Sequence, residues 1–164
     1  MKKLLRLGVL VFSVFFFSVP TAAEAELKEN VESFIPAEYQ QYCVEIGERY
    51  QICPELLIAM IEQESAGKPY VSNGACLGLM QVNEYYHADR MAKLGVSSLY
   101  DPYGNILVGA DYVHELFLEY KDTGTVLMVY NGKRNAVSLG AAGDYTDYAT
   151  VIMKRAAAME TLHQ

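Results

Sequence analysis

Residues 54–65 have the sequence PELLIAMIEQES. Pro54 suits the first turn of a helix, because the amide hydrogen that proline lacks would have no partner there. Residues 56–61 are apolar on every side of such a helix, so we expect other helices to surround it. Gly67 and Pro69 follow closely and favour an end near Ser65. This segment therefore predicts a buried, central helix.

Helical signals recur along the rest of the chain, whereas no segment shows strand-like alternation, an internal repeat or low complexity. The predicted helices are Ala37 to Tyr50; Asn83 or Glu84 to Leu94, stopped by Gly95; a long helix to Tyr120 that Asn105 can cap; Val126 to Tyr130; and a last helix from Asp144 or Thr146 through Met159. The pattern indicates an all-α protein of about six helices.

Length and composition limit the classes that need consideration. The chain has 164 residues, which is too short for two ordinary domains. Of these residues 52% are apolar, a larger share than is typical of intrinsically disordered proteins. The formal net charge is −7, and no cluster of basic residues is visible. A protein that binds the phosphate backbone needs such a cluster, so we expect no nucleic-acid partner.

The first 25 residues have the layout of a secretory signal peptide. Lys2, Lys3 and Arg6 precede a mainly apolar run over residues 7–19, and Ala23-Glu24-Ala25 offers a small-x-small cleavage site. A membrane anchor needs about 20 apolar residues, which this run does not reach. We therefore expect export through the Sec pathway to an extracellular or cell-wall location, with no membrane span in the mature form.

Three segments follow from this interpretation. Residues 1–25 form the signal peptide, 26–36 a short mobile leader, and 37–164 one compact domain.

The cysteines and histidines do not point to a metal. Cys43, Cys53 and Cys76 include no C-x-x-C pair, and the three histidines have no ligand-like spacing. Cys43 and Cys53 are the nearest possible disulfide partners, but spacing does not decide pairing. No nucleotide, flavin or nicotinamide motif is present, so we expect no cofactor.

Glu64 is the most informative polar residue. It follows Leu57, Met60 and Ile61 at the spacing i, i+3, i+4, i+7, and therefore continues an apolar face into the last helical turn. Apolar surroundings and the negative end of the helix dipole both raise the pKa of a carboxyl group there, which suits a general acid. The ordinary alternative is a solvated or ion-paired glutamate. Glu62 is expected to be a solvated surface charge.

Several short motifs occur together in a characteristic order. The motifs are Glu64-Ser65, Gly78-Leu79-Met80-Gln81, Asn105 at a helix start, Tyr130-Asn131-Gly132 and Tyr148. Together they span about residues 40–160, and the set resembles the lytic transglycosylase domain of the soluble type, which is related in fold to goose-type lysozyme. The stretch 99–109 is similar to versions from Gram-positive bacteria.

The resemblance implies a single lysozyme-like helical domain with a substrate groove, and roles for particular residues. Glu64 would be the catalytic acid, and Tyr148 would lie close to its carboxyl group. Tyr130 and Asn131 would face the acid across the groove. Ser72, Met80 and Gln81 would contact the sugar, the Gln81 amide by both donating and accepting hydrogen bonds.

The implied activity is cleavage of the bond between N-acetylmuramic acid and N-acetylglucosamine in peptidoglycan glycan strands, with one glutamate acting as acid and then base. A muramidase on the same fold and a non-catalytic secreted module that binds cell walls remain alternatives. A two-carboxylate glycosidase needs a second acid about 5–9.5 Å away. Asp89, Asp101, Glu115 and Asp144 are formally available for that role.

Overall fold

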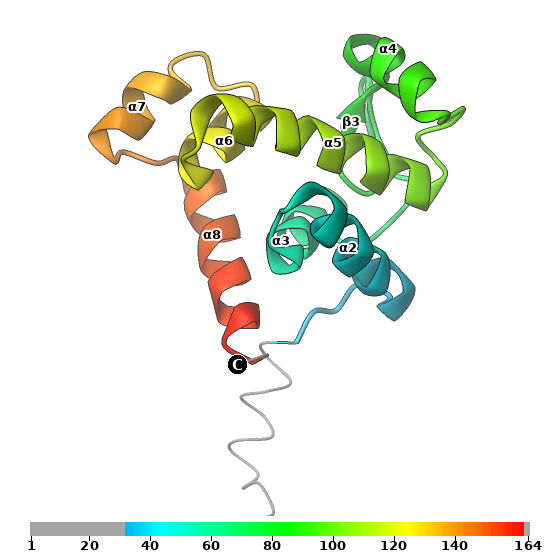
Figure 1. The fold of residues 1–164 in the computed structure, drawn as a ribbon, viewed down its shortest axis with the longest axis horizontal. Helices are drawn as coiled ribbons and strands as arrows, with labels where there is room; N and C mark the ends of the chain where they lie inside the picture. The colour runs from blue at the N-terminus through cyan, green and yellow to red at the C-terminus, as the bar shows by residue number, and fades with distance from the viewer. Residues whose placement is uncertain (1–31, 163–164) are drawn as a thin grey trace, which may run out of the picture. The chain divides into compact units, whose positions relative to one another are not determined.

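The computed structural model describes residues 32–162, which form seven α-helices and one small antiparallel sheet (Figure 1). The helices are α2 (Ala37–Tyr50), α3 (Pro54–Ser65), α4 (Glu84–Leu94), α5 (Pro102–Tyr120), α6 (Thr123–Tyr130), α7 (Ala136–Ala142) and α8 (Asp147–Glu160). The strands are β1 (Ser72–Asn73), β2 (Cys76–Leu77) and β3 (Val82–Asn83). The predicted all-α class is confirmed.

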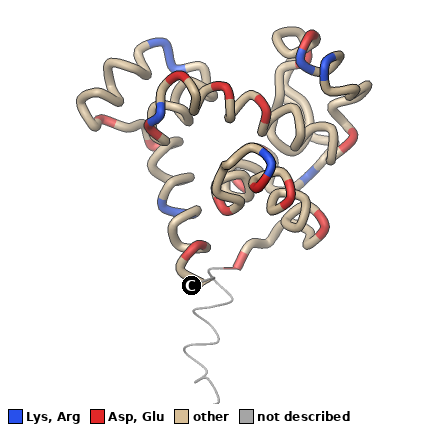
Figure 2. Tube along the Cα trace, viewed as in Figure 1, with Lys and Arg blue, Asp and Glu red and all other residues tan. Residues whose placement is uncertain are grey.

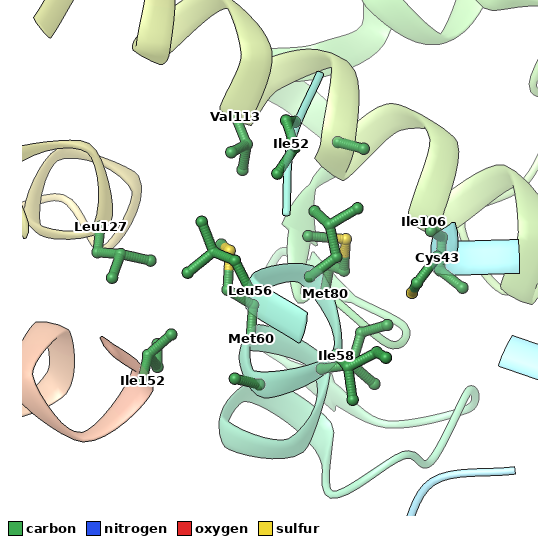
Figure 3. Packing of buried hydrophobic residues seen from close by; sticks show 14 of the residues in the cluster. Cys43, Ile52, Leu56, Ile58, Met60, Met80, Ile106, Val113, Leu127 and Ile152 are labelled. Atoms are coloured by element: carbon green, nitrogen blue, oxygen red, sulfur yellow. The ribbon is translucent and has the colours of Figure 1, made fainter. Parts of the chain in front are cut away.

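Helix α3 lies at the centre of the helices, as its sequence predicts. All six residues from 56 to 61 are at most 5% exposed. Helix α3 packs against α2 and α8, while α5 packs against α2 and α6. In Figure 3, Leu56 and Met60 of α3 lie among side chains from α5, α6 and α8, namely Val113, Leu127 and Ile152. Burial of this apolar surface is the main favourable contribution to folding.

The ends of the first three helices agree with the predicted bounds. Helices α2, α3 and α4 each end at a residue in the left-handed conformation: Gln51, Ala66 and Gly95 respectively. This conformation turns the chain out of the helix axis and lets the next amide bond back to the last turn. The turn after α3 directs the following segment across the end that carries Glu64.

The predicted start of α5 at Asn105 is wrong. Asp101 caps this helix, because its Oδ2 accepts a hydrogen bond from the Gly104 N–H at 2.8 Å. Asn105 lies within the first turn and is fully buried. Its Nδ2 donates to the carbonyl oxygens of Leu77 and Leu99 at 2.8 and 2.9 Å, and its Oδ1 accepts from the Met80 N–H at 2.8 Å.

The small sheet was not predicted from the sequence. Strands β1 and β2 pair through Ser72 with Leu77, and β2 and β3 pair through Leu77 with Val82. Each strand has only two residues, which is too short for alternation of polar and apolar side chains to be visible. Between β2 and β3 lies the turn of residues 78–81, which Asn105 ties to α5.

The C-terminal helices differ from the prediction in two ways and agree with it in one. Helix α6 begins at Thr123, because Asp122 accepts a hydrogen bond from the Thr125 N–H at 2.7 Å. Helix α7 was not predicted, because its seven residues span only about two turns, which is too short for a helical period to be visible in the sequence. Of the two predicted starts for the last helix, the one at Thr146 is observed, as Thr146 caps α8.

Residues 32–36, which the sequence analysis assigned to a mobile leader, pack against the domain. Ile35 is 3% exposed and belongs to the core. Ser33 Oγ donates to Glu62 Oε1 at 2.7 Å, and Arg155 of α8 contacts the opposite oxygen of Glu62 at 2.6 Å. Glu62 therefore forms a buried ion pair, and its assignment as a solvated surface charge is wrong. The predicted signal peptide lies outside the described residues.

Charged residues are spread over several elements in Figure 2, with Lys and Arg on α2, α4, α8 and the loop before α7. Within residues 32–162, no helix combines the length and apolar character that crossing a bilayer requires.

Replacement of Asn105 by leucine should destabilise the domain by about 2–4 kcal/mol, because buried backbone groups at residues 77, 80 and 99 lose their partners while the branched shape of the side chain is kept. The measurement is the free energy of unfolding by urea denaturation. Asn135→Ala is the control, since Asn135 is exposed and makes no capping hydrogen bond. A loss for Asn105→Leu as small as that of the control would contradict the prediction.

Candidate active site

A cavity of about 860 Å³ opens at the end of α3, between the small sheet, α4, α5 and α6. This volume is in the range of clefts that bind small molecules. The cavity is lined by Glu64, Val71, Asn73, Cys76, Gln81, Val82, Asn83, Tyr86, His87, Arg90, Tyr112, Glu115, Val129, Tyr130, Asn131 and Gly132.

Glu64 lies in the last turn of α3, where the core meets the cavity. The residues that precede it on the same face, Leu57, Met60 and Ile61, are fully buried, and Glu64 itself is half-buried. Burial raises the pKa of the Glu64 carboxyl group above its ordinary value, and a hydrogen bond from Tyr148 opposes part of this rise. A larger fraction of Glu64 is therefore protonated at a given pH than for a solvated glutamate.

Tyr148 holds one oxygen of Glu64. The Tyr148 hydroxyl, on α8, donates to Glu64 Oε1 at 2.5 Å. Burial and the negative charge of Glu64 hold the pKa of Tyr148 far above its ordinary value, so this phenol remains a donor. Within the described residues, Oε2 of Glu64 has no hydrogen-bond or ion-pair partner. The carboxyl group is thus oriented by one oxygen and available to a ligand through the other.

Tyr130 and Asn131 lie at the end of α6 and line the same cavity as Glu64. The Tyr130 hydroxyl donates to the carbonyl oxygen of Met80 at 2.8 Å, which connects α6 to the 78–81 turn. Asn131 is exposed to solvent at the rim.

The 78–81 turn presents Gln81 to the cavity in a constrained form. Gln81 has φ of 49°, and its Nε2 donates to the carbonyl oxygens of Gly78 at 2.9 Å and Val71 at 3.2 Å. Both amide hydrogens are thereby used inside the protein. The side chain can accept a hydrogen bond from a ligand through Oε1, whereas the resemblance implied both donation and acceptance.

The structure does not bring Met80 and Ser72 to the cavity. The Met80 side chain is fully buried beneath the turn, where its sulfur faces Gly109 of α5, and only its backbone carbonyl takes part in the site through Tyr130. Ser72 is exposed on β1, and its neighbours Val71 and Asn73 line the cavity instead. In a strand, successive side chains point to opposite faces, which separates Ser72 from Asn73.

A group of cavity residues on α4 and α5 was not predicted: Tyr86, His87, Arg90, Tyr112 and Glu115. Arg90 pairs with Asp111 and Glu115, and its guanidinium lies 5.3 Å from the centre of the Tyr112 ring. Burial, followed by the charge of Arg90, lowers the pKa of His87. The sequence shows that Tyr86 and Arg90 share one face of a helix, and that Tyr112 and Glu115 share one face of another. It does not show that these two helix faces meet at the cavity.

Among the described residues, Glu115 is the second carboxylate that lines the cavity, and it is paired with Arg90 at 2.6 Å. Of the other candidate acids, Asp101 caps α5, while Asp89 and Asp144 are exposed and do not line the cavity.

The three cysteines are free thiols, so the Cys43–Cys53 disulfide considered above does not form in this structure. Cys43 is buried in the core, which raises the pKa of its thiol to about 12. Within residues 32–162, no group of three or more His, Cys, Asp or Glu side chains could hold a metal ion.

The amino-acid sequence is similar to those of several known proteins. The chain is 36% identical over 95 residues to the transglycosylase of Enterobacteria phage PRD1, covering 57% of this chain and 34% of the phage protein. It is 36% identical over 90 residues to invasion protein IagB of Salmonella typhimurium, covering 50% of this chain and 56% of that protein. The chain thus spans about a third to about half of the length of these relatives. The likeness to Gram-positive versions stays a prediction.

The fold is similar to that of a solved structure, an inactive mutant of the lytic transglycosylase Slt from Pseudomonas aeruginosa. The TM-score is 0.66 at 18% sequence identity, covering 79% of this chain and 25% of the Slt chain. At this identity the likeness shows a shared fold. Residues 41–147 match the family described as the transglycosylase SLT domain, which is more than half of the chain. The chain therefore belongs to the transglycosylase SLT domain family.

Proposed function

We propose that this protein is a secreted lytic transglycosylase that cleaves the β-1,4 bond between N-acetylmuramic acid and N-acetylglucosamine in peptidoglycan. The observation that carries the proposal is Glu64, a half-buried carboxyl group with a raised pKa and one oxygen open to an 860 Å³ cavity. Membership of the SLT domain family supports the same substrate class.

In the proposed reaction, Glu64 acts first as an acid. Protonated Glu64 gives its proton to the glycosidic oxygen, which leaves as the 4-hydroxyl of N-acetylglucosamine. The oxygen of the substrate's own 2-acetamido group stabilises the positive charge on the muramyl C1. The Tyr148 hydroxyl then stabilises the carboxylate that forms on Glu64, through the hydrogen bond to Oε1.

Glu64 acts next as a base. Its carboxylate takes the proton of the muramyl 6-hydroxyl, whose oxygen attacks C1 and closes a 1,6-anhydro ring. The glycosidic bond is broken, one intramolecular C–O bond forms, no water is consumed, and Glu64 ends protonated as it began. A residue that gives and retakes one proton works best with an intermediate pKa, and burial shifts the pKa of Glu64 upward, in that direction.

The distribution of carboxylates supports a route with one acid. A two-carboxylate glycosidase uses a second carboxylate as nucleophile or base. Glu115 is the other cavity carboxylate among the described residues, and it is engaged in an ion pair with Arg90. Gln81 Oε1 and Asn131 are polar groups at the cavity that could contact the N-acetyl groups of the glycan.

Glu64→Gln should lower the rate of peptidoglycan cleavage by at least about a hundredfold, because glutamine has no proton to transfer. Mass spectrometry of the released muropeptides measures the reaction and identifies its product. Anhydromuramyl ends are expected from the unsubstituted protein, whereas reducing ends would indicate a muramidase. A Glu64→Gln protein as active as the unsubstituted one would leave a non-catalytic binding module as the better interpretation.

Tyr148→Phe should move the alkaline limb of the rate profile to higher pH. Loss of activity with rising pH reports ionisation of the acid, and the Tyr148 hydrogen bond lowers the pKa of Glu64. Removing it leaves burial unopposed, so the pKa rises and the protonated acid persists to higher pH. The measurement is kcat/KM on soluble glycan fragments across pH.

Tyr145→Phe is the matched control for this pH profile. Its hydroxyl donates to Asp122 Oδ1 at 3.0 Å, and Tyr145 does not line the cavity. This control should keep the profile of the unsubstituted protein. A Tyr148→Phe limb that stays in place or moves to lower pH would contradict the assigned role of Tyr148.

Export is part of the proposal and rests on the sequence of residues 1–25. Expression of the full chain in a bacterial host should release a shortened protein to the outside of the cytoplasmic membrane. Mass spectrometry of that protein should place its N-terminus near residue 26, or near residue 24 if Thr21-Ala22-Ala23 is cut instead. A full-length protein that stays in the cytoplasm would contradict this part.

A further inference from the structure

We propose that Arg90 is a positioning residue: by pairing with Asp111 and Glu115 of α5, it holds α4 in place and fixes the side of the cavity that substrate contacts. That side is the aromatic wall formed by His87, Tyr112 and Tyr130. The inference rests on the proposed function in one respect, namely that the ligand of the cavity is peptidoglycan.

Arg90 connects α4 directly to α5, and through Asp111 indirectly to α2. Its two terminal nitrogens donate to Asp111 and Glu115, and its Nε donates to His87 Nδ1 at 3.4 Å. Asp111 also accepts a hydrogen bond from the Tyr50 hydroxyl of α2 at 3.0 Å. The side chains of Arg90 and Asp111 are only 14% and 15% exposed. Ion pairs that are shielded in this way are screened less by salt than surface pairs.

The same guanidinium sets the position of the aromatic wall. It lies 5.3 Å from the centre of the Tyr112 ring, which is the geometry of a cation–π contact. The ring centre of Tyr112 is 4.5 Å from that of His87 and 5.5 Å from that of Tyr130. The three rings therefore form a continuous series of contacts from α4 to Tyr130, which lines the cavity together with Glu64.

Helix α4 depends on this anchor because apolar packing holds it weakly. Met91 is its one buried residue, whereas α3 has seven. In Figure 1, α4 lies at the edge of the molecule, and its main contacts are with α5 and β3. A helix with so little buried surface obtains little orientation from the hydrophobic effect. The polar contacts of Arg90 supply the missing constraint.

Loss of Arg90 would also create repulsion on α5. Asp111 and Glu115 are four residues apart on one face of this helix, with Tyr112 next to them. Like charges at this spacing repel each other, and Asp111 would lose its cationic partner while shielded from water. Movement of these groups would displace the Tyr112 ring on which His87 and Tyr130 pack.

The test compares Arg90→Gln with Arg90→Lys and with the control Arg49→Gln. Arg49 has a cation–π contact of nearly the same distance, 5.4 Å to the Tyr50 ring, but it is exposed and does not line the cavity. The measurements are the melting temperature of each protein and its kcat and KM on soluble peptidoglycan fragments. Arg90→Lys keeps the charge but cannot contact both carboxylates in the bidentate geometry of arginine.

Arg90→Gln should raise KM by about tenfold or more with a much smaller change in kcat, because the binding surface is displaced while Glu64 and Tyr148 are kept. Arg90→Lys should restore part of the loss, and Arg49→Gln should behave as the unsubstituted protein. A purely structural role would lower the melting temperature and the active fraction without changing KM. An unchanged KM in folded Arg90→Gln would overturn the proposal.

A binding assay separates this proposal from the proposed function. The Glu64→Gln protein, with and without Arg90→Gln, is sedimented with insoluble peptidoglycan, so that no catalysis is needed. Arg90→Gln should weaken binding by the same factor as it raises KM, and equal binding of the two proteins would overturn the role of Arg90. If the unsubstituted protein binds but forms no anhydromuramyl product, only the proposed function fails.

Discussion

The enclosure of α3 is the constraint on which the rest of the structure depends. Residues 56–61 are apolar all round, so this helix is stable only when it is enclosed: α2 and α8 pack against it, and core side chains of α5 and α6 lie beside it (Figure 3). Once it is enclosed, its direction decides where the core ends. Glu64 lies at that end, half in the apolar interior and half in the cavity, and its raised pKa is a consequence of the same burial that stabilises the fold.

The 78–81 turn is the second feature that links fold and site. Asn105 binds the backbone at residues 77, 80 and 99 with one side chain, and the turn that it fixes carries Gln81 and the carbonyl that receives the Tyr130 hydroxyl. Gly78 has φ of 73°, and a Cβ atom there would lie 2.4 Å from the Leu99 carbonyl oxygen. The close approach of this turn to α5 therefore requires glycine. The same few hydrogen bonds therefore stabilise the fold and fix the geometry of the site.

The cavity has two sides that are held by different kinds of interaction. The Glu64 side is held by apolar packing and by hydrogen bonds from tyrosines of α6 and α8. The α4 side is held by ion pairs and by contacts between tilted aromatic rings around Arg90. Apolar packing fixes position through shape, whereas ion pairs fix it through charge and remain sensitive to substitution of one partner. A cleft built in this way can keep the Glu64 carboxyl group in a fixed position while the opposite side depends on a single side chain.

The sequence by itself determined the helical class and the bounds of α2, α3 and α4. It also determined that Glu64 continues the buried apolar face of α3 into its last turn. These depend on contacts within about one or two helical turns, which periodicity, Pro54 and Gly95 report directly. Only the tertiary structure decided that Asp101 rather than Asn105 caps α5, that Glu62 pairs with Arg155, and that Met80 is buried while Arg90 and Tyr112 face the cavity. The Asp101 cap is itself local, but Asn105 is occupied by backbone partners at residues 77 and 80. Glu62 pairs with a residue 93 positions away, and the places of Met80, Arg90 and Tyr112 depend on which of two faces is covered. No local pattern in one chain specifies such distant partners.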